Sequence, residues 1–280
     1  MIYKKMDQIA VKQLLPERMP DTHKGDYGRI LLLCGSKGFT GAAALAAMGA
    51  LRSGAGVVYL GVPESIYPIE AAKLLEPVVF PLPEKNGMLR VSRKIEELLP
   101  RMDSVLVGPG LGQSKETFSV VETVLRKCQC PVVLDADGIN VLSGHKNILR
   151  DRKGVTVLTP HDGEFLRIAG SLGEDRCADA AAFAAETGCV VLLKGYRTVI
   201  TDGESCYVNE TGNPGMAVGG SGDVLAGIIV SLLGQGIDPL QAAACGAWVH
   251  GAAGDICARE IGQYGMLPRD MLNVLPRLLP

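Results

Sequence analysis

The sequence has no excess of charge of one sign and no long apolar run. Its 28 Lys and Arg nearly balance 30 Asp and Glu, which gives a formal net charge of −2. A protein that binds duplex nucleic acid needs a basic face to neutralise phosphates, so we expect no nucleic-acid partner. The most apolar stretch, residues 224–234, is 11 residues long, whereas a helix needs roughly 18 or more to span a bilayer. We therefore expect no membrane segment.

The N-terminus and the cysteines lack the patterns of a secreted protein. Residues 1–20 carry charges throughout and contain no apolar core of a signal peptide. The eight cysteines are scattered, with no C-x-x-C and no Cys/His spacing typical of zinc. The simplest interpretation is a cytoplasmic protein whose reduced cysteines act as small hydrophobic residues.

Glycine, in contrast, is abundant, and apolar runs alternate with helical patterns. The 35 glycines among 280 residues suggest loops in which the backbone approaches a ligand closely. Short apolar runs separated by Ala-rich or amphipathic stretches predict a three-layer α/β/α fold with a mostly parallel central sheet. No linker divides the chain, so we expect one catalytic domain over residues 26–280, preceded by an N-terminal arm of residues 1–25.

The predicted elements follow from these patterns. Strands are expected at 29–34, 56–61, 78–81, 104–108, 131–135, 155–159, 189–194, 198–201 and 206–209. The last two are expected to form an antiparallel hairpin at the edge of the sheet. Helices are expected at 41–53, 91–99, 115–127, 162–169, 175–187, 223–233 and 239–259. Ligands of open parallel sheets bind beyond the carboxyl ends of the strands, and the unusual loop sequences follow these strands.

The most informative loop is Gly-Gly-Ser-Gly-Asp at 219–223, directly before the most apolar helix. Backbone N–H groups of Gly220, Ser221 and Gly222 at a helix N-terminus would form an anion hole for a transferring phosphoryl group. Asp223 could then accept a proton from an attacking hydroxyl. An ordinary helix cap is the alternative, but a cap does not require three glycines.

Carboxylate side chains follow two of the predicted strands, 131–135 and 155–159. Asp135 and Asp137 lie in LDADG, and Glu164 lies in PHDGE next to His161. Mg²⁺ prefers oxygen ligands and retains several waters, so these side chains are candidates for a metal-phosphate site. Each of them is also common as a turn or cap residue. His250, in an Ala/Gly-rich helix, is more simply a structural residue.

Two familiar nucleotide motifs are absent. GSKGFTG at 35–41 has the spacing G-x-x-G-x-x-G rather than that of a dinucleotide fingerprint, and no G-x-x-x-x-G-K-[ST] occurs. Ligand contact and simple helix packing are equally good explanations of this glycine turn.

Taken together, the motifs resemble the ribokinase-like superfamily and, within it, the ADP- or ATP-dependent NAD(P)HX dehydratases. The resemblance covers about residues 23–275. Its most specific part is NETGNPGMAVGGSGDVLAGII at 209–229, in which Asn-Pro-Gly-Met precedes Gly-Ser-Gly-Asp. The segments HKGDYGRILLLCGSKGFTGAAALAA, GPGLG, LDADGIN, LTPHDGE and LKGYRT occur in the order that this family shows.

The resemblance implies a ribokinase-like fold and a hydro-lyase of cofactor repair. Such an enzyme dehydrates the 6S epimer of hydrated NADH or NADPH (NADHX or NADPHX), restores NAD(P)H, and converts ADP or ATP to AMP or ADP and phosphate with Mg²⁺. The residues that match as substrate contacts are Ala42, Gly110, His161 and Asp223, with Asp223 also the catalytic base. Those that match as nucleotide contacts are Lys194, Gly195, Tyr196, Arg197, Thr198 and Gly222.

Other implications remain open at the level of the sequence. His161-x-x-Glu164 stands where superfamily kinases have an Asn-x-x-Glu metal and phosphate motif, so a metal role for Glu164 is only suggested. The resemblance also suggests a homo-oligomer, with a tetramer as one candidate. Only about 25 residues precede the matching motifs, so we expect no epimerase domain here and a separate epimerase acting upstream.

Two alternative functions fit the same glycine loops. A ribokinase-superfamily kinase for a vitamin precursor or a sugar would release a stable phosphorylated product. A non-catalytic nucleotide-binding protein would have no use for a carboxylate that faces the anion hole, so Asp223 argues against it.

Overall fold

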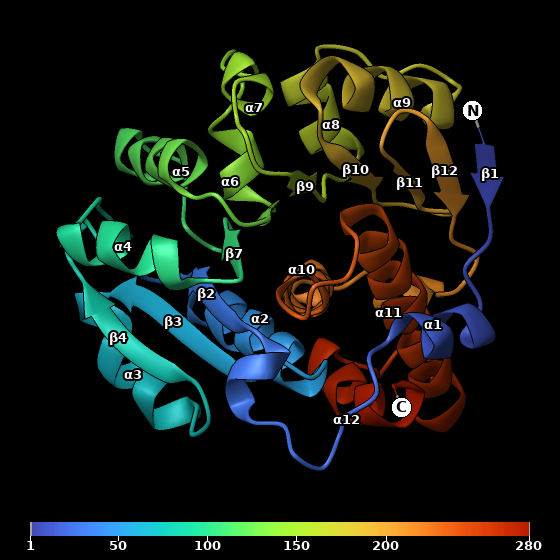
Figure 1. Cartoon of the computed structure of the whole chain (residues 1–280), viewed down its shortest axis with the longest axis horizontal. Helices are drawn as coiled ribbons and strands as arrows, with labels where there is room; N and C mark the ends of the chain where they lie inside the picture. The colour runs from blue at the N-terminus through green and yellow to red at the C-terminus, as the bar shows by residue number, and fades with distance from the viewer. Residues whose placement is uncertain (1, 280) are drawn as a thin grey trace.

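A ten-stranded sheet forms the centre of the structure, a computed structural model that describes residues 2–279 (Figure 1). The strand order is β1-β12-β11-β10-β9-β8-β7-β2-β3-β4. Neighbouring strands from β4 to β10 are parallel, whereas β11 is antiparallel to both β10 and β12. The strands are β1 (Ile2–Lys4), β2 (Arg29–Leu33), β3 (Val57–Pro63), β4 (Val78–Leu82), β7 (Ser104–Val107), β8 (Val132–Leu134), β9 (Thr156–Leu158), β10 (Val190–Leu193), β11 (Val199–Thr201) and β12 (Ser205–Val208), with β5 (Glu84–Lys85) and β6 (Met88–Leu89) in a separate small hairpin.

Helices cover both faces of the sheet, as Figure 1 shows. The α-helices are α1 (Gln8–Leu14), α2 (Thr40–Arg52), α3 (Tyr67–Lys73), α4 (Arg93–Leu98), α5 (Lys115–Lys127), α6 (Asp137–Asn140), α7 (Asn147–Arg150), α8 (Asp162–Ala169), α9 (Arg176–Thr187), α10 (Ser221–Gly234), α11 (Pro239–Glu260) and α12 (Pro268–Leu278). Short 3₁₀ helices lie at Lys24–Tyr27, Glu64–Ile66, Leu99–Arg101 and Pro214–Met216. No helix within residues 2–279 is long and apolar enough to cross a membrane.

Alternation of apolar side chains along the strands produces two separate cores. Leu32 in β2 packs in the core that contains α2, α10, α11 and α12, whereas its neighbour Leu33 packs in the core with α5, α8 and α9. Successive side chains of a strand point to opposite faces, so a continuous apolar run serves both cores. The predicted three-layer fold is confirmed.

Close packing between α2 and α10 fixes the position of the α10 N-terminus. A Cβ atom added at Gly227 would lie 2.2 Å from the carbonyl oxygen of Ala46, and one added at Gly49 would lie 2.7 Å from that of Val224. The two helices therefore approach each other backbone to backbone. This contact holds the first turn of α10 beside the carboxyl ends of the central strands.

The expected strands are all present, but the predicted sheet edge is wrong. β11 and β12 form the expected antiparallel hairpin. β1 then pairs in parallel with β12, with Ile2 opposite Ser205, so β12 is not the outermost strand. Residues expected as an arm thus include a strand of the main sheet and α1, whose Val11 is fully buried. The three residues of this strand, Ile-Tyr-Lys, are too few to show the alternation that predicts a strand.

Candidate functional site

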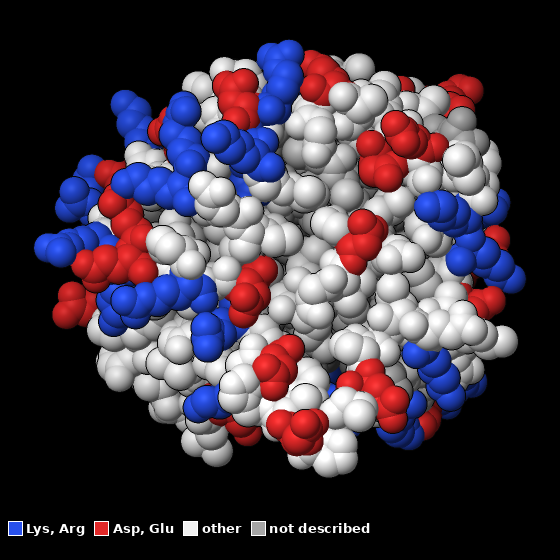
Figure 2. Space-filling view, in the orientation of Figure 1, with Lys and Arg blue, Asp and Glu red and all other residues white. Residues whose placement is uncertain are grey.

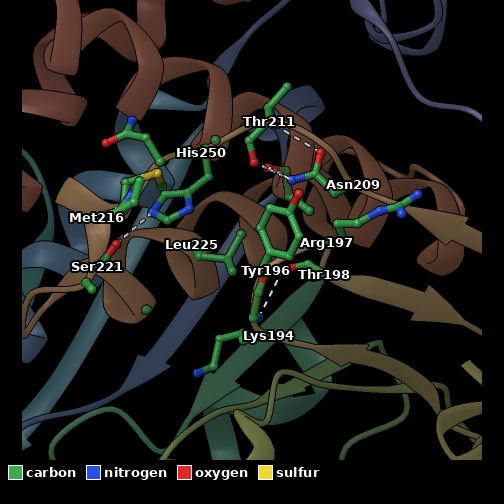
Figure 3. Close-up of a pocket in the computed structure, with 18 of the residues that line it drawn as sticks. Lys194, Tyr196, Arg197, Thr198, Asn209, Thr211, Met216, Ser221, Leu225 and His250 are labelled. Carbon is green, nitrogen blue, oxygen red and sulfur yellow. Dashed lines mark hydrogen bonds between the residues drawn. The ribbon is translucent and has the colours of Figure 1, made fainter. Parts of the chain in front are cut away.

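A cavity of about 960 Å³ lies beyond the carboxyl ends of β9 and β10, against the N-terminus of α10 (Figure 3). This is the position expected for a ligand of an open parallel sheet. The predicted site residues His161, Lys194, Gly195, Tyr196, Arg197, Thr198, Ser221 and Gly222 line it. It is also lined by Asn209, Glu210, Thr211, Gly212, Asn213, Pro214, Met216, Ala217, Val218, Leu225, Ala247, His250 and Gly251. The cavity is large enough for a nucleotide-sized ligand.

The first turn of α10 is left open toward this cavity. Gly220 is the N-cap residue, with a φ of 98°, and it has no side chain that could cap the helix. That left-handed backbone suits glycine, because a Cβ atom there is strained. The structure therefore contradicts the cap alternative for Asp223, which lies inside the first turn. The N–H of Ser221 donates to the carbonyl oxygen of Val218 at 3.3 Å. The N–H of Gly222, which lines the cavity, and the helix dipole still make this turn suitable for an anion.

A half-buried lysine lies beside this turn and joins two strand ends. Lys194 Nζ is 2.9 Å from Asp135 Oδ1 and 3.8 Å from Glu164 Oε2. Thr159 Oγ1 also donates to Asp135 Oδ1, at 2.8 Å. A Cβ atom added at Gly222 would lie 3.4 Å from Lys194 Nζ. The lysine thus places a positive charge directly at the helix N-terminus, where a phosphoryl group would bind.

Asp223 belongs to this cluster, and its pKa is raised. Burial, followed by the negative charge of Asp135, raises the pKa of Asp223 to about 6, although the positive charge of Lys194 opposes the shift. Asp223 and Asp135 in turn contribute to the raised pKa of Cys34, a fully buried thiol just after β2 whose acidity is reduced chiefly by burial. A carboxyl with a pKa near 6 is ionised at neutral pH and remains a stronger base than an ordinary Asp.

His161 and Glu164 form a reciprocal cap at the start of α8. His161 Nδ1 accepts the N–H groups of Gly163 at 3.0 Å and of Glu164 at 3.3 Å. Glu164 Oε2 accepts the N–H of His161 at 2.9 Å. Because Nδ1 is an acceptor, a neutral ring carries its hydrogen on Nε2. His161 lines the cavity through this oriented ring, whereas Glu164 is almost completely buried beneath it.

The loop after β10 is held by Arg176 of α9, a residue that sequence reasoning missed. Arg176 Nη2 donates to the carbonyl oxygen of Lys194 at 2.7 Å, and Nη1 donates to that of Tyr196 at 3.3 Å. Thr198 Oγ1 donates to the carbonyl oxygen of Gly195 at 3.0 Å. These contacts fix the loop while Tyr196, exposed over 93% of its surface, projects at the rim of the cavity.

Helix α11 supports the opposite wall of the cavity. Thr211 Oγ1 donates to the carbonyl oxygen of Trp248 at 3.0 Å, and Asp255 accepts from the N–H of Gly212 and from Asn213 Nδ2, both at 3.0 Å. Asp255 was not identified from the sequence, since a lone carboxylate on a helix carries no distinguishing pattern. It joins the loop before α10 to α11 through two hydrogen bonds.

His250 of α11, interpreted from the sequence as a structural residue, contributes to the wall of the site. It lines the cavity, and its Nε2 lies 3.4 Å from Ser221 Oγ, as the dashed line in Figure 3 shows. Burial lowers the pKa of His250 to about 4, so the ring is neutral at neutral pH. His250 therefore packs under the first turn of α10 without adding charge.

The remaining predicted substrate residues lie at a second group of loops. A Cβ atom added at Gly110 would lie 2.9 Å from the Ala42 Cβ, so these two residues are neighbours. Asp137 Oδ2 accepts the N–H of Gly112 at 2.8 Å. Ala136, with a φ of 48°, separates Asp137 from Asp135, which faces Lys194. Within the described residues, Ala42, Gly110, Gly220, Glu164 and Asp223 are not among those lining the cavity.

The carboxylates do not form a metal cage of their own. Among residues 2–279, no group of three or more His, Cys, Asp or Glu side chains is placed to hold a metal ion. Asp135 Oδ2 nevertheless lies 3.8 Å from the position of a Cβ at Gly222, beside the open helix turn. Mg²⁺ is commonly held by one or two carboxylates together with substrate phosphates. The donors present fit an ion that binds with a nucleotide.

Charged side chains on the face shown in Figure 2 are distributed unevenly. Lys and Arg gather on the left and upper left, around the α4 and α5 region, while the centre is mostly uncharged with scattered Asp and Glu. Some Asp and Glu lie among these Lys and Arg side chains, so the charge on this side of the face is mixed.

Comparison with known proteins identifies relatives over almost the whole chain. A family model described as NAD(P)H-hydrate dehydratase matches residues 30–277. A bifunctional NAD(P)H-hydrate repair enzyme from Moorella thermoacetica is 46% identical over 95% of this chain and 52% of the relative. The chain thus spans about half the length of such bifunctional relatives. An ADP-dependent (S)-NAD(P)H-hydrate dehydratase from Bacillus subtilis is 36% identical over 96% of this chain and 95% of the relative.

Solved structures agree with this result. The ADP/ATP-dependent NAD(P)H-hydrate dehydratase from Bacillus subtilis, co-crystallised with ATP and Mg²⁺, is 33% identical and superposes with a TM-score of 0.82 over 97% of this chain and 96% of that one. The predicted ribokinase-like fold is confirmed by this likeness and by those to more distant members of the superfamily.

Proposed function

Because the chain belongs to the NAD(P)H-hydrate dehydratase family, we propose that it uses ADP or ATP to dehydrate the 6S epimer of hydrated NADH or NADPH. The observation that carries this proposal is the position of Asp223. Its carboxyl group lies in the first turn of α10, where the uncapped N-terminus faces Lys194. A base and a phosphoryl-binding site thus share one helical turn. The reaction is that of a hydro-lyase.

The proposed chemistry turns a poor leaving group into a good one. The hydroxyl at C6 of the hydrated ring does not leave readily. Asp223 accepts its proton while the oxygen attacks the terminal phosphoryl group of the nucleotide. The C6–O bond of the phosphate ester then breaks, phosphate leaves with the oxygen, and C5 loses a proton as the ring double bond re-forms. The products are NAD(P)H, phosphate and AMP or ADP. A positioned base commonly contributes about 10²–10⁴-fold.

In this proposal the nucleotide and the hydrated cofactor bind to different loops. The nucleotide lies in the cavity along residues 194–198 and Gly222, with its transferred phosphoryl group against residues 220–222. The hydrated cofactor reaches Asp223 from the Ala42 and Gly110 side, and His161 contacts it across the cavity. The side-by-side position of Ala42 and Gly110 supports a shared substrate surface. Apolar lining by Met216, Val218 and Leu225 suits a purine base.

Mg²⁺ is proposed to enter with the nucleotide phosphates. When bound, the ion neutralises charge on the phosphate oxygens. Asp135 and Glu164 are the side chains that would hold it, directly or through its waters. Lys194 keeps these two carboxylates next to each other in the structure. A cytoplasmic location and a homo-oligomeric assembly are further parts of the proposal.

The experiment that tests this function is incubation of the purified protein with the 6S hydrate, Mg²⁺ and either ADP or ATP. We expect NADH absorbance to return and the nucleotide to lose one phosphate per NADH formed. The matched comparison uses hydroxyethylthiazole, hydroxymethylpyrimidine and ribose as acceptors. A stable phosphorylated product from one of these, with the hydrate unchanged, would instead establish a superfamily kinase.

The loop after β10 provides a separate prediction for nucleotide binding. Gly195 has a φ of 155°, and a Cβ atom there would lie 2.7 Å from Arg176 Nη2. Gly195→Val should therefore displace the Arg176 contacts and weaken nucleotide affinity by at least tenfold, about 1.4 kcal/mol. Calorimetry should show nearly unchanged affinity for the hydrated cofactor. Equal losses for both ligands would contradict the assignment of this loop to the nucleotide.

A further inference from the structure

Two cysteines at the amino ends of the central strands place their sulfur atoms in contact. Cys128 ends α5 and Cys130 precedes β8, and their Sγ atoms are 3.2 Å apart. Cys128 is buried, with 4% of its surface exposed, whereas Cys130 is partly exposed. Asp135 follows the carboxyl end of β8, and Lys194 follows that of β10, which runs in the same direction. The thiol pair, at the amino end of β8, therefore lies at the opposite end of the strands from the cavity.

Arg152 organises the turn that carries the pair. Its Nη2 donates to the carbonyl oxygens of both Cys128, at 3.3 Å, and Cys130. Its Nη1 donates to the carbonyl oxygen of Val155 at 2.5 Å. The guanidinium therefore fixes the backbone on both sides of the C-x-C turn and holds the two sulfur atoms close to each other.

The two thiols also differ in acidity. The hydrogen bond between the two thiols, followed by the positive charge of Arg152, lowers the pKa of Cys128 to about 7 against the effect of burial. The same hydrogen bond raises the pKa of Cys130. Cys189, also near Arg152, lacks such a thiol donor, and burial raises its pKa to about 11. A thiolate, not a thiol, is the nucleophile in disulfide exchange. The pair shares one proton across the Sγ–Sγ contact, so transfer of that proton to the buried Cys128 leaves the thiolate on the partly exposed Cys130.

We propose that Cys128 and Cys130 are a redox-active dithiol, which a low-molecular-weight disulfide such as oxidised glutathione converts to an intramolecular disulfide. Cys130, the accessible member, transfers its proton to Cys128 and attacks the external disulfide, which forms a mixed disulfide and releases one glutathione thiolate. Cys128 then loses its proton and attacks the Cys130 sulfur, and the second glutathione thiolate leaves. The two cysteines lose two electrons and two protons, and one oxidised glutathione becomes two reduced molecules.

Geometry favours closure over a lasting mixed disulfide. A disulfide bond is about 2.05 Å long, so the sulfur atoms, already 3.2 Å apart, need only a small approach. The second thiol is thus at high effective concentration once the mixed disulfide forms. The site is independent of the proposed dehydratase activity, since it uses neither the cavity nor Asp223.

The test equilibrates the full-length protein in reduced and oxidised glutathione, followed by alkylation and tryptic mass spectrometry. Cleavage after Lys127 and Lys146 leaves both cysteines in one peptide, residues 128–146. In predominantly oxidised glutathione we expect most of this peptide to lose two hydrogens and to resist alkylation. Full reversal is expected with excess reduced glutathione.

Three variants separate the steps. Cys128→Ala should retain glutathione on Cys130, because the second attack is lost, and Cys130→Ser should lose both products. Cys177→Ser, which removes a partly exposed cysteine elsewhere, should behave like the unsubstituted protein. The mass-spectrometric result for the unsubstituted protein tests the proposal by itself, even if a variant fails to fold. A peptide that stays fully reduced, or that keeps glutathione on Cys130 without closing, would overturn the proposal.

Discussion

Replacing Asp223 with Asn should reduce turnover by at least about 10²-fold, the lower end for a lost general base. The amide keeps the size of the side chain but cannot accept the C6 hydroxyl proton. The N–H groups of residues 220–222 stay in place, because Gly220 rather than Asp223 is the cap of α10. Nucleotide affinity should therefore change little. Steady-state kinetics and calorimetry on the same preparation measure both quantities, and near-normal turnover would remove Asp223 from the role of base.

The acidity of Asp223 adds a pH dependence to this result. Turnover of the unsubstituted protein should fall as the pH drops below about 6, because the pKa of Asp223 is raised to that value and the protonated carboxyl is no base. The folded state binds this proton more tightly than the unfolded chain does. The contribution of Asp223 to stability is therefore favourable at low pH and lost as pH rises through about 6. Asp223→Asn should accordingly raise the melting temperature at pH 7, by an amount that shrinks toward pH 5.

Replacing Lys194 with Met should produce the second large effect, on both activity and stability. The change removes the cation beside the phosphoryl-binding turn, and loss of one such preorganised group costs about 10²–10³-fold in turnover. It also leaves Asp135, only 1% exposed, without its ion partner. Breaking a buried pair costs about 3–5 kcal/mol in the free energy of unfolding. Denaturant titration and initial rates are the measurements.

Arg197→Met is the matched control in the same loop. Arg197 is exposed and pairs with Glu210 at 3.4 Å, so its loss should change the free energy of unfolding by about 0–1 kcal/mol. If Lys194→Met lowered the free energy of unfolding as little as this control and left turnover unchanged, the lysine would be neither a structural nor a phosphoryl-binding element.

The sequence was sufficient to predict the arrangement of this site at the level of loops. Parallel strands place their carboxyl ends on one side of the sheet, so LDADG and LKGYRT were expected to approach one another there. GSGD, which opens a helix, was expected to bind the same ligand. Lys194, Asp135 and Gly222 are indeed neighbours. Periodicity also identified the central strands, because apolar runs buried on both faces are conspicuous.

The parts that the sequence did not predict depend on tertiary contacts. Arg176, Asp255 and His250 act through partners distant in sequence, and each looks locally like an ordinary helical residue. The edge strand β1 has only three residues, too few to show an alternating pattern. Contact between Cys128 and Cys130 likewise depends on the turn held by Arg152, so the scattered cysteines gave no sign of a pair.

The central claim is that the C6 oxygen of the hydrated cofactor leaves as part of phosphate, after Asp223 has taken its proton. The most direct test uses the 6S hydrate prepared in isotopically labelled water, so that a heavy oxygen marks the C6 hydroxyl. After turnover with ATP and Mg²⁺ in ordinary water, mass spectrometry of the released phosphate should find one labelled oxygen for each NADH formed. Label found in the solvent, with unlabelled phosphate, would contradict phosphoryl transfer to the substrate and, with it, the catalytic role of the first turn of α10.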